Sequence, residues 1–410
     1  MVDNALSPHG GTIVERLEEP AKAKERIKGL PRIEIRSQIA REVMSIAYGY
    51  FSPLEGFMTQ ADVDSVVNKL TLASGYVWSI PIVFDIGERE LQELGAKQGD
   101  TVLLTYQGNP LATLDIEEVF SYDLDVMAEK VYGTKEDKHP GVRRTKAYAG
   151  RFLGGKVTIV NPPKINPPFD EFFYPPRRLR EEFSRRGWKR VVAHQTRNVP
   201  HTGHEWLMKG AWFEANADAV LANPVIGEKR AGDYIDEAII VTHDALRKAG
   251  YFAENIHMTS FLFWDMRYAG PREAVFHAIV RKNLGCTHHM FGRDHAGVGT
   301  YYDPYAAHEI FEELPDLGIY PVKALEWFYC PECAGIAYEE QCGHKDAAQR
   351  FSGSLIRSII QDGVQPPRLL FRPEIFELVM ECAEKYGGGS PFVTENYLKR
   401  GDPVMTVPAL

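Results

Sequence analysis

Residues 194–205, "HQTRNVPHTGHE", place a dense set of hydrogen-bond donors directly after an apolar run. The side chains that could contact a ligand are Gln195, Thr196, Arg197, Asn198, His201 and His204. The two histidines of the pattern H-x-G-H are three residues apart, so on a helix they lie on one face. The planar guanidinium of Arg197 matches the oxygens of an oxyanion better than a lysine would. The stretch therefore indicates a site for anions with several oxygens.

The pattern H-x-G-H is typical of nucleotidyltransferases, in which two imidazoles donate hydrogen bonds to phosphate oxygens. A helix that starts here adds backbone N–H groups and a positive dipole end, which favour the same ligand. Gly203 is expected to let a ligand approach the backbone. A structural role accounts equally well for an isolated H-x-G-H, with His201 as a helix cap and His204 packed or solvated. Arg197 beside the pattern favours the anion site.

Residues 292–299, "GRDHAGVG", form a second candidate anion site. The residues of interest are Gly292, Arg293, Asp294, His295 and Ala296. The glycines allow backbone N–H groups to line an anion site, and Arg293 and His295 are further donors. Asp294 would repel a phosphate unless it holds Arg293 or a ligand hydroxyl. The alternative is a glycine-rich turn with an internal Arg–Asp ion pair.

A cysteine-rich segment provides a third candidate site. Cys330, Cys333, Cys342 and His344 form the pattern C-x2-C-x8-C-x-H in a chain with only five cysteines. Three thiolates and one imidazole satisfy the tetrahedral preference of structural zinc and leave no position open for catalysis. The ion would stabilise a short insertion that lacks a core of its own. The alternatives are another transition metal and a set of buried free cysteines.

The elements that must position these residues alternate between strands and helices. Strands are predicted at 190–195, 219–224, 256–263 and 287–292, and helices at 177–187, 201–216, 233–250 and 271–285. This alternation indicates βαβ units, a parallel sheet and right-handed crossovers. Both candidate anion sites follow a predicted strand, and ligands bind beyond the carboxyl ends of parallel strands. We therefore expect the two sites to converge on one ligand.

Changes of pattern along the chain predict an α/β protein with three domains. Residues 1–170 are β-rich, with strands over 76–87 and 100–120 and a hairpin turn at "QGNP". A proline-dense segment separates this region from the next and suits a domain boundary. Residues 171–325 carry the alternating strands and helices. Residues 326–410 form a small C-terminal domain that contains the Cys3His site.

The composition is that of an ordinary globular protein, with 44% hydrophobic and 25% charged residues in 410. A net charge of -9 argues against a nucleic-acid binder, because phosphate neutralisation needs a basic surface. No secretory signal is recognised, and no stretch reaches the ~20 apolar residues that cross a bilayer. Five cysteines are too few for a disulfide framework, so we expect a cytoplasmic protein in which Cys286 and Cys382 are packed thiols.

Three segments, "QTRNVPHTGH", "MRYAGPREAVFHAIVRKNLGCTHHMFGRDHAG" and "FSGSLIR", together resemble ATP sulfurylase. The resemblance covers most of the chain and implies a PUA-like β-rich domain, a Rossmann-like parallel-sheet catalytic domain and a small C-terminal α/β domain. It implies that ATP and sulfate react to give adenylyl sulfate and pyrophosphate, with Mg²⁺, in a homodimer. The zinc cluster departs from the commonest form of the family but is similar to that of some prokaryotic members, and no adenylyl-sulfate kinase-like domain is expected.

The resemblance also implies roles for residues of both candidate anion sites. It implies sulfate ligands at Gln195, Arg197 and the backbone of Ala296. It implies catalytic residues at Thr196, Arg197, Asn198, His201 and His204. It implies nucleotide contacts at Gln195, Asn198, His201, His204, Gly292, Arg293, Asp294, His295 and Leu325. The two sites would then hold sulfate beside the phosphorus that it attacks.

The chemistry of the donors agrees with this reaction. Sulfate needs no general base, so the site has to align sulfate with the α-phosphorus and stabilise developing charge. Donors dominate both candidate sites and carboxylates are nearly absent, which favours direct in-line attack without a covalent enzyme intermediate. The alternatives are another H-x-G-H adenylyltransferase and a zinc-bearing scaffold without activity. The sequence leaves open the physiological direction, which is either sulfate activation or ATP formation in sulfur oxidation.

Overall fold

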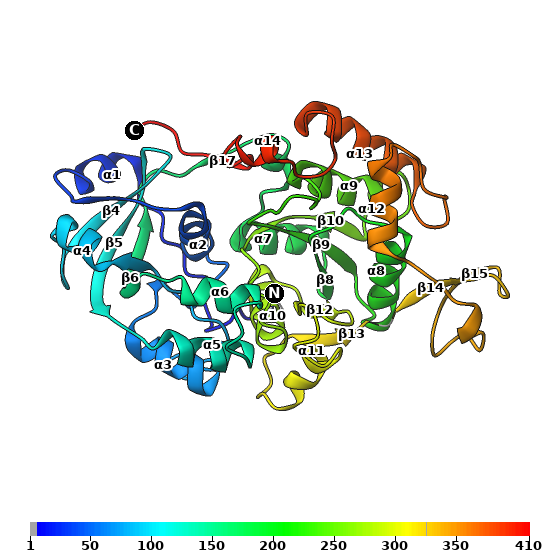
Figure 1. The fold of residues 1–410 in the computed structure, drawn as a ribbon, viewed down its shortest axis with the longest axis horizontal. Helices are drawn as coiled ribbons and strands as arrows, with labels where there is room; N and C mark the ends of the chain where they lie inside the picture. Colours follow the sequence, from blue (N-terminus) through cyan, green and yellow to red (C-terminus); the bar gives the residue numbers. More distant parts are fainter. Residues whose placement is uncertain (1–5, 325) are drawn as a thin grey trace.

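The computed structural model describes residues 6–324 and 326–410. Leu325, one of the expected nucleotide contacts, lies outside the described residues. Figure 1 shows the β-rich first part of the chain beside an α/β part, from which a small hairpin projects. Over the described part of the chain, no helix is both long and apolar enough to cross a bilayer.

The first part of the chain is built on a mixed six-stranded sheet. Its strands are β1 (Arg32–Glu34), β2 (Gly56–Phe57), β3 (Asp85–Gly87), β4 (Thr101–Tyr106), β5 (Asn109–Phe120) and β6 (Gly150–Ile159), in the order β1-β4-β5-β6-β2 with β3 beside β6. Around it lie α1 (Pro20–Arg26), α2 (Ser37–Ala47), α3 (Gln60–Lys69), α4 (Glu88–Leu94), α5 (Leu124–Tyr132) and α6 (Pro140–Lys146). The predicted hairpin turn is confirmed, because Gln107 and Gly108 between β4 and β5 have positive φ values of 56° and 75°, as a two-residue turn requires.

The strand predicted over 76–87 is reduced to β3 at its end. Trp78, Ile80, Ile82 and Phe84 are buried in the hydrophobic core of this part. The run is apolar because it is buried, and an apolar run does not by itself require pairing along its whole length. The prediction of a full strand is therefore wrong.

The second part contains the predicted parallel sheet. Its order is β10 (His257–Thr259), β9 (Ala219–Ile226), β8 (Val191–Thr196), β12 (His288–Phe291) and β13 (Tyr320–Lys323), and β11 (Leu262–Phe263) also pairs with β9. The helices are α7 (Pro176–Arg186), α8 (Thr202–Glu214), α9 (Asp236–Lys248), α10 (Pro271–Leu284) and α11 (Ala306–Glu309). α10 begins with proline in its first turn and ends before Gly285, whose φ is 95°, as its sequence predicts.

The C-terminal part consists of a hairpin and a set of helices. The antiparallel hairpin sheet contains β14 (Trp327–Cys330), β15 (Gly335–Tyr338) and β16 (Gln349–Arg350). It is followed by α12 (Gly353–Gln361), α13 (Pro373–Tyr386), α14 (Glu395–Leu398) and β17 (Met405–Thr406), which pairs with β7 (Lys164–Ile165). Short 3-10 helices are η1 (Phe169–Phe172), η2 (Ile310–Glu312) and η3 (Lys345–Ala347). Ile356 of α12 and Ile375 of α13 share a hydrophobic core with Val192 of β8, and α13 packs against α9.

Candidate active site and metal centre

The first candidate segment lies at the carboxyl end of β8 and continues into α8. The His201 N–H donates to His204 Nδ1 (3.3 Å), and the His204 N–H donates to His201 Nδ1 (3.4 Å). The two rings stack with their centroids 3.8 Å apart. Because each Nδ1 accepts a hydrogen bond, the proton of each neutral ring is on Nε2. Both Nε2–H groups are therefore available as donors, while the Nδ1 atoms cap the helix.

Burial keeps both imidazoles neutral at pH 7. It lowers the pKa of His204 to about 4. Burial, together with the neighbouring His204, lowers the pKa of His201 well below 6.5. The pair can therefore bind an anion through hydrogen bonds without adding charge. The anion-binding and structural explanations of H-x-G-H are therefore compatible, since one nitrogen of each ring caps the helix and the other can donate.

Gly203 is required by packing inside the protein. A Cβ at this position would lie 2.8 Å from Phe351 Cδ2 and 2.9 Å from His201 Cε1, closer than side chains pack. The Phe351 ring stacks on His201 with the centroids 5.8 Å apart. The Thr202 N–H also has a partner, the Leu370 carbonyl at 3.0 Å. The space left by the missing side chain of Gly203 is therefore occupied by Phe351 and His201, and the expected approach of a ligand to its backbone stays a prediction.

Arg197 is held by three oxygens from two loops. Its Nη1 donates to the Tyr268 hydroxyl, and its Nη2 donates to the Glu228 carbonyl (3.3 Å) and to Asp233 Oδ2 (3.4 Å). Burial lowers the pKa of the guanidinium, but Tyr268 and Asp233 outweigh burial and raise it above its usual value. The side chain is still 22% exposed. Arg197 is therefore a fixed cation that a ligand can reach.

Asn198 is fixed in the turn between β8 and α8. Its N–H donates to Thr196 Oγ1 (3.1 Å), and its carbonyl accepts from His243 Nε2 (3.0 Å). Arg357 Nη2 donates to Asn198 Oδ1 (3.2 Å). Thr196 thus shapes the turn, while His243 and Arg357 are residues of the site that sequence reasoning missed. The polar segment "RFSGSLIR", which contains Arg357, is a sequence signal for the second of them.

Gln195 lies near the end of β8 beside Met266. Its Nε2 is 3.7 Å from Met266 Sδ, and its Oε1 is buried without a hydrogen-bond partner among the described residues. Buried polar atoms in proteins are nearly always paired. Because the side-chain amide can flip and exchange its oxygen and nitrogen positions, Gln195 can offer either a donor or an acceptor to a bound molecule.

The second candidate segment follows β12 and is held mainly through its backbone. Asp294 and Ala296 have left-handed φ values of 56° and 54°, which are uncommon for residues other than glycine. The Asp294 N–H donates to the Pro304 carbonyl (2.8 Å), and the Gly270 N–H donates to the Ala296 carbonyl (3.0 Å). Arg293 and Asp294 are exposed and form an ion pair at 3.4 Å. This internal pair explains why a carboxylate can lie in a donor-rich segment.

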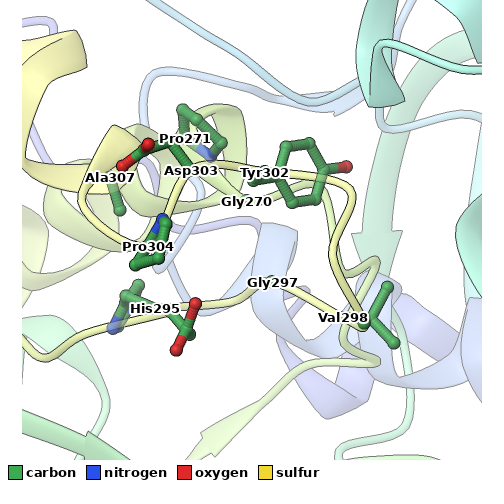
Figure 2. Close-up of a pocket in the computed structure, with 11 residues that line it drawn as sticks. Gly270, Pro271, His295, Gly297, Val298, Tyr302, Asp303, Pro304 and Ala307 are labelled. Carbon is green, nitrogen blue, oxygen red and sulfur yellow. The ribbon is translucent and has the colours of Figure 1, made fainter.

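The imidazole of His295 turns toward the interior. Its Nε2 lies 3.1 Å from His277 Nδ1 on α10, and its ring packs on Phe291 with the centroids 4.9 Å apart. Figure 2 shows His295 across a small cavity from Gly270 and Pro271 at the start of α10. The cavity encloses about 10 Å³, room for about one water molecule. The second segment is therefore packed against α10, and this cavity is too small for a nucleotide.

The two segments lie side by side, as their positions after parallel strands predict. β8 and β12 are neighbours in the sheet, with Ala193 opposite His289, and His289 Nδ1 donates to the Ala193 carbonyl at 3.1 Å. The loop before α10 links the segments, because its Tyr268 contacts Arg197 and its last residue contacts the second segment. The predicted convergence at one edge of the sheet is confirmed.

The cysteine-rich segment brings four metal-ligating atoms together at the hairpin. The sulfurs of Cys330, Cys333 and Cys342 and the Nδ1 of His344 all lie within 4.8 Å of one another. The Nδ1 atom is 3.3, 3.7 and 3.8 Å from the three sulfurs, and two of the sulfurs are 3.8 Å apart. In a tetrahedral zinc site, bonds of about 2.0–2.3 Å place the ligand atoms about 3.5–3.8 Å apart. The cluster can therefore hold a tetrahedral metal ion.

The other two cysteines, Cys286 and Cys382, are buried. Burial raises the pKa of each thiol to about 12. A protonated buried thiol is neither a nucleophile nor a metal ligand. The prediction that both are packed residues is confirmed.

The hairpin contacts α8 through aromatic side chains. Trp206 of α8 and Trp327 of β14 stack with their centroids 5.7 Å apart. A Cβ at Gly210 of α8 would lie 2.7 Å from the Trp327 ring, so glycine permits the close approach. The histidine pair lies at the start of α8, and the hairpin with the Cys3His cluster packs against the same helix further along.

Comparison with known proteins agrees with this architecture. A family model described as ATP-sulfurylase matches residues 170–382, and a model of a PUA-like domain matches residues 6–162. The sulfate adenylyltransferase of Archaeoglobus fulgidus is 43% identical over 96% of this chain and 94% of its own length. Those of Hyperthermus butylicus and Pyrococcus abyssi are 41% and 40% identical over 91% of this chain and 95% and 97% of their own lengths.

A solved structure titled as a hexameric APS kinase from Thiobacillus denitrificans has a similar fold. The TM-score is 0.71, and the match covers 92% of this chain and 68% of that chain. At 23% identity, this likeness concerns the fold alone. The expected fold class, a PUA-like domain followed by an α/β catalytic part with a parallel sheet, is confirmed. The chain belongs to the ATP-sulfurylase family.

Proposed function

We propose that this chain is a sulfate adenylyltransferase, which converts ATP and sulfate into adenylyl sulfate and pyrophosphate. One observation carries the proposal, the combination of a fixed cation, Arg197, with two neutral imidazoles that can donate from Nε2. One cation and two neutral donors suit two neighbouring oxyanions. Relatives named for this activity, 40–43% identical over nearly the whole chain, support it.

We assign sulfate to the junction of the two segments. Its ligands would be the Gln195 amide, the Arg197 guanidinium and the backbone N–H of Ala296. The neighbouring positions of β8 and β12 support this assignment, because they bring the first and second segments to one sheet edge. A guanidinium can form two parallel hydrogen bonds to a tetrahedral oxyanion.

We assign the nucleotide to residues of both segments, with Gln195 shared between the two substrates, and to Leu325 further along the chain. The proposed contacts are Gln195, Asn198, His201, His204, Gly292, Arg293, Asp294, His295 and Leu325. Arg357 joins this set, because its guanidinium already contacts Asn198 at 3.2 Å. Phe351 supports the histidine pair from the side of the C-terminal helices.

The reaction is proposed to be a single displacement. One sulfate oxygen attacks the α-phosphorus while the bond between that phosphorus and the oxygen bridging to the β-phosphorus breaks, and pyrophosphate leaves with the electron pair. Sulfate is a dianion at neutral pH, so no proton has to be removed. The residues with catalytic roles would be Thr196, Arg197, Asn198, His201 and His204. Their donors stabilise the charge that develops on the α-phosphate and the leaving group.

We propose that Zn²⁺ occupies the Cys3His cluster as a structural ion. Three thiolates and one imidazole suit zinc and leave no coordination position for a substrate. Mg²⁺ is proposed to enter with ATP, held by its phosphates, where it neutralises charge on the leaving pyrophosphate. A cytoplasmic homodimer and a division into domains near residues 170 and 325 are further proposals. Light scattering tests the dimer, and limited proteolysis tests the boundaries.

The decisive assay is exchange of labelled pyrophosphate into ATP by the purified protein with and without sulfate. We expect exchange only when sulfate is present. Exchange that instead depends on a mononucleotide or phosphopantetheine would support another H-x-G-H adenylyltransferase, and no exchange with any acceptor would support an inactive scaffold. An adenylylated protein formed from ATP alone would contradict direct transfer. Assays in both directions measure which one the enzyme favours.

A further inference from the structure

We propose that Glu273 is a positioning residue whose buried carboxylate fixes both anion-binding segments in one arrangement. The inference rests on the proposed function, because it concerns the geometry of the same site. Glu273 lies in the first turn of α10, and its side chain is fully buried. It acts on the first segment through Tyr268 and on the second through His277.

The first arm runs through the loop before α10. Glu273 Oε1 accepts from the Arg267 N–H (2.9 Å), and Oε2 accepts from the Ala269 N–H (3.1 Å). These two amides flank Tyr268, whose φ of 60° lies in the left-handed region. That conformation is strained for a residue with a side chain and persists only where its surroundings hold it. The Glu273 carboxylate stabilises this conformation through its hydrogen bonds to the backbone on both sides of Tyr268.

Tyr268 is also held from the first part of the chain. Its carbonyl accepts from His139 Nε2 (3.1 Å) and from the Tyr302 hydroxyl (3.1 Å). His139 Nδ1 accepts from the Gly141 N–H (3.1 Å), so the proton of a neutral ring is on Nε2. With its backbone fixed in this way, the Tyr268 hydroxyl accepts from Arg197 Nη1. The position of the Arg197 guanidinium therefore depends on the loop that Glu273 holds.

The second arm runs along α10 to the second segment. Glu273 Oε1 lies 3.6 Å from His277 Nε2, and His277 Nδ1 lies 3.1 Å from His295 Nε2. The first of these distances is longer than a hydrogen bond, so the carboxylate acts on the ring electrostatically and favours a proton on Nε2. That leaves Nδ1 as the acceptor for His295 Nε2–H. Glu273 thereby favours one tautomer of His277, and the bond between His277 and His295 ties His295 to α10.

The charge of Glu273 is essential to this arrangement. Burial raises the pKa of its carboxyl, but His277, the Arg267 amide and the Trp264 indole outweigh burial and lower it. The Trp264 Nε1–H donates to Oε1 at 2.7 Å, so the carboxylate accepts at both oxygens. A glutamine has nearly the same shape but accepts at only one of its two terminal atoms. Glu273→Gln therefore breaks the arrangement with little change in volume.

The test compares Glu273→Gln with the wild type in initial-rate assays that vary ATP and sulfate separately. We expect kcat to fall about 100-fold, the loss that accompanies a misplacement of about 1 Å, and KM to rise for both substrates. Glu237→Gln is the matched control, because Glu237 is also buried and accepts from the Tyr397 hydroxyl (2.7 Å) on a different helix. Both variants should melt at lower temperature, but only Glu273→Gln should lose activity.

Variants at two further positions test separately the connection through Tyr268 and the connection through His277. Tyr268→Phe removes only the hydroxyl and should raise KM for sulfate about tenfold without changing KM for ATP. His277→Phe removes both ring nitrogens and should raise KM for ATP about fivefold without changing KM for sulfate. His277→Asn restores an acceptor near the Nδ1 position, so it should recover the wild-type KM for ATP.

Wild-type kinetic constants in Glu273→Gln, with a loss of stability like that of the control, would overturn the inference. If Glu273→Gln does not fold, unchanged KM values in both Tyr268→Phe and His277→Phe would overturn it instead. A wild-type protein without sulfate-dependent activity would refute the proposed function and this inference with it. If the wild type is active and the variants keep its kinetic constants, only the inference is refuted and the proposed function stands.

Discussion

Two histidine sites in this molecule, the pair at the start of α8 and the Cys3His cluster of the hairpin, use opposite ring nitrogens. In the pair, the Nδ1 atoms of His201 and His204 accept backbone N–H groups, and Nε2 is the donor offered to a ligand. In the cluster, Nδ1 of His344 lies 3.3–3.8 Å from three sulfur atoms. The protein positions the first two rings through its own backbone, whereas the third ring belongs to a cluster of side chains that could hold a metal ion.

The difference follows from the hydrophobic core behind each site. The core behind α8 includes Val192 of β8, Met208 of α8 and Ile375 of α13. The buried cluster of the hairpin consists of Phe328, Cys330, Ala337 and Cys342. Two of its four members are themselves metal ligands, and a core this small does not fold a chain without a metal or disulfides. The candidate anion site is therefore held by the protein's own core, and we expect the hairpin to depend on a bound ion.

The largest expected effect comes from removing the fixed cation of the anion site. Arg197→Ala should lower kcat/KM for sulfate about 10²–10³-fold, the usual loss for one donor to developing oxyanion charge, and the protein should remain folded. Arg197→Lys keeps the charge without the planar fork, so it should recover only part of the activity. Initial rates and thermal unfolding measure both. Normal rates in Arg197→Ala would contradict this account, since the candidate anion site would then not depend on the Arg197 cation.

A smaller effect should distinguish the two nitrogens of His204. His204→Asn can accept the His201 N–H but has no donor at the Nε2 position, so kcat should fall about 10–100-fold. His204→Gln reaches the Nε2 position but not the cap, so it should keep more activity and lose about 1 kcal/mol in the free energy of unfolding. Rate assays and urea unfolding measure the two quantities. The reverse pattern would mean that Nδ1 faces the ligand.

Metal removal should affect the hairpin before it affects catalysis. Chelation or Cys333→Ser should remove about one equivalent of zinc per chain and make residues 327–350 sensitive to protease. Activity should fall less than in the Arg197 and His204 variants, because the hairpin lies beyond the first turn of α8. Cys382→Ser is the control, since this packed cysteine should leave the metal content unchanged. A metal-free hairpin that resists protease would show that its small core folds unaided.

The smallest expected effect is that of pH on the stability of the folded protein. The pKa of His204 is lowered from 6.5 to about 4 in the folded protein, so the unfolded chain binds more protons between these values. The free energy of unfolding should be level above about pH 7 and fall as the pH drops below about 6.5. His204→Asn should reduce that slope by up to about 1.4 kcal/mol per pH unit. Urea unfolding at a series of pH values measures the slope, and an unchanged slope in His204→Asn would mean that folding does not lower the pKa of His204.

Much of the fold follows from periodicity and punctuation in the sequence. The helix predicted over 271–285 corresponds to α10, because proline and glycine mark its ends. The strand predicted over 190–195 corresponds to β8, because an apolar run between two polar segments suits a buried parallel strand. The run 76–87 misled the prediction because burial makes a segment apolar whether or not it pairs.

The candidate site could be predicted only where its residues are neighbours in sequence. The histidine pair and the metal ligands each lie within fifteen residues, so their spacing reports a shared structure. The contact of His139 with Tyr268 spans 129 residues and joins two parts of the chain. Packing of Phe351 on Gly203 likewise arises only when the segment between β16 and α12 meets α8. The spacing of residues within a short segment cannot predict such contacts, because they form only when distant parts of the chain pack together.

The stack of Trp206 on Trp327 places two indoles at the junction of α8 and the hairpin. Indole emission depends on the surroundings of the ring, so the protein carries a built-in optical reporter at this junction. Loss of the metal should change the emission spectrum as the rings separate and meet water. The chain contains six tryptophans, and a Trp327→Phe variant would identify the share of the signal that belongs to the hairpin. Binding and release of the metal could then be followed in real time on the unlabelled protein.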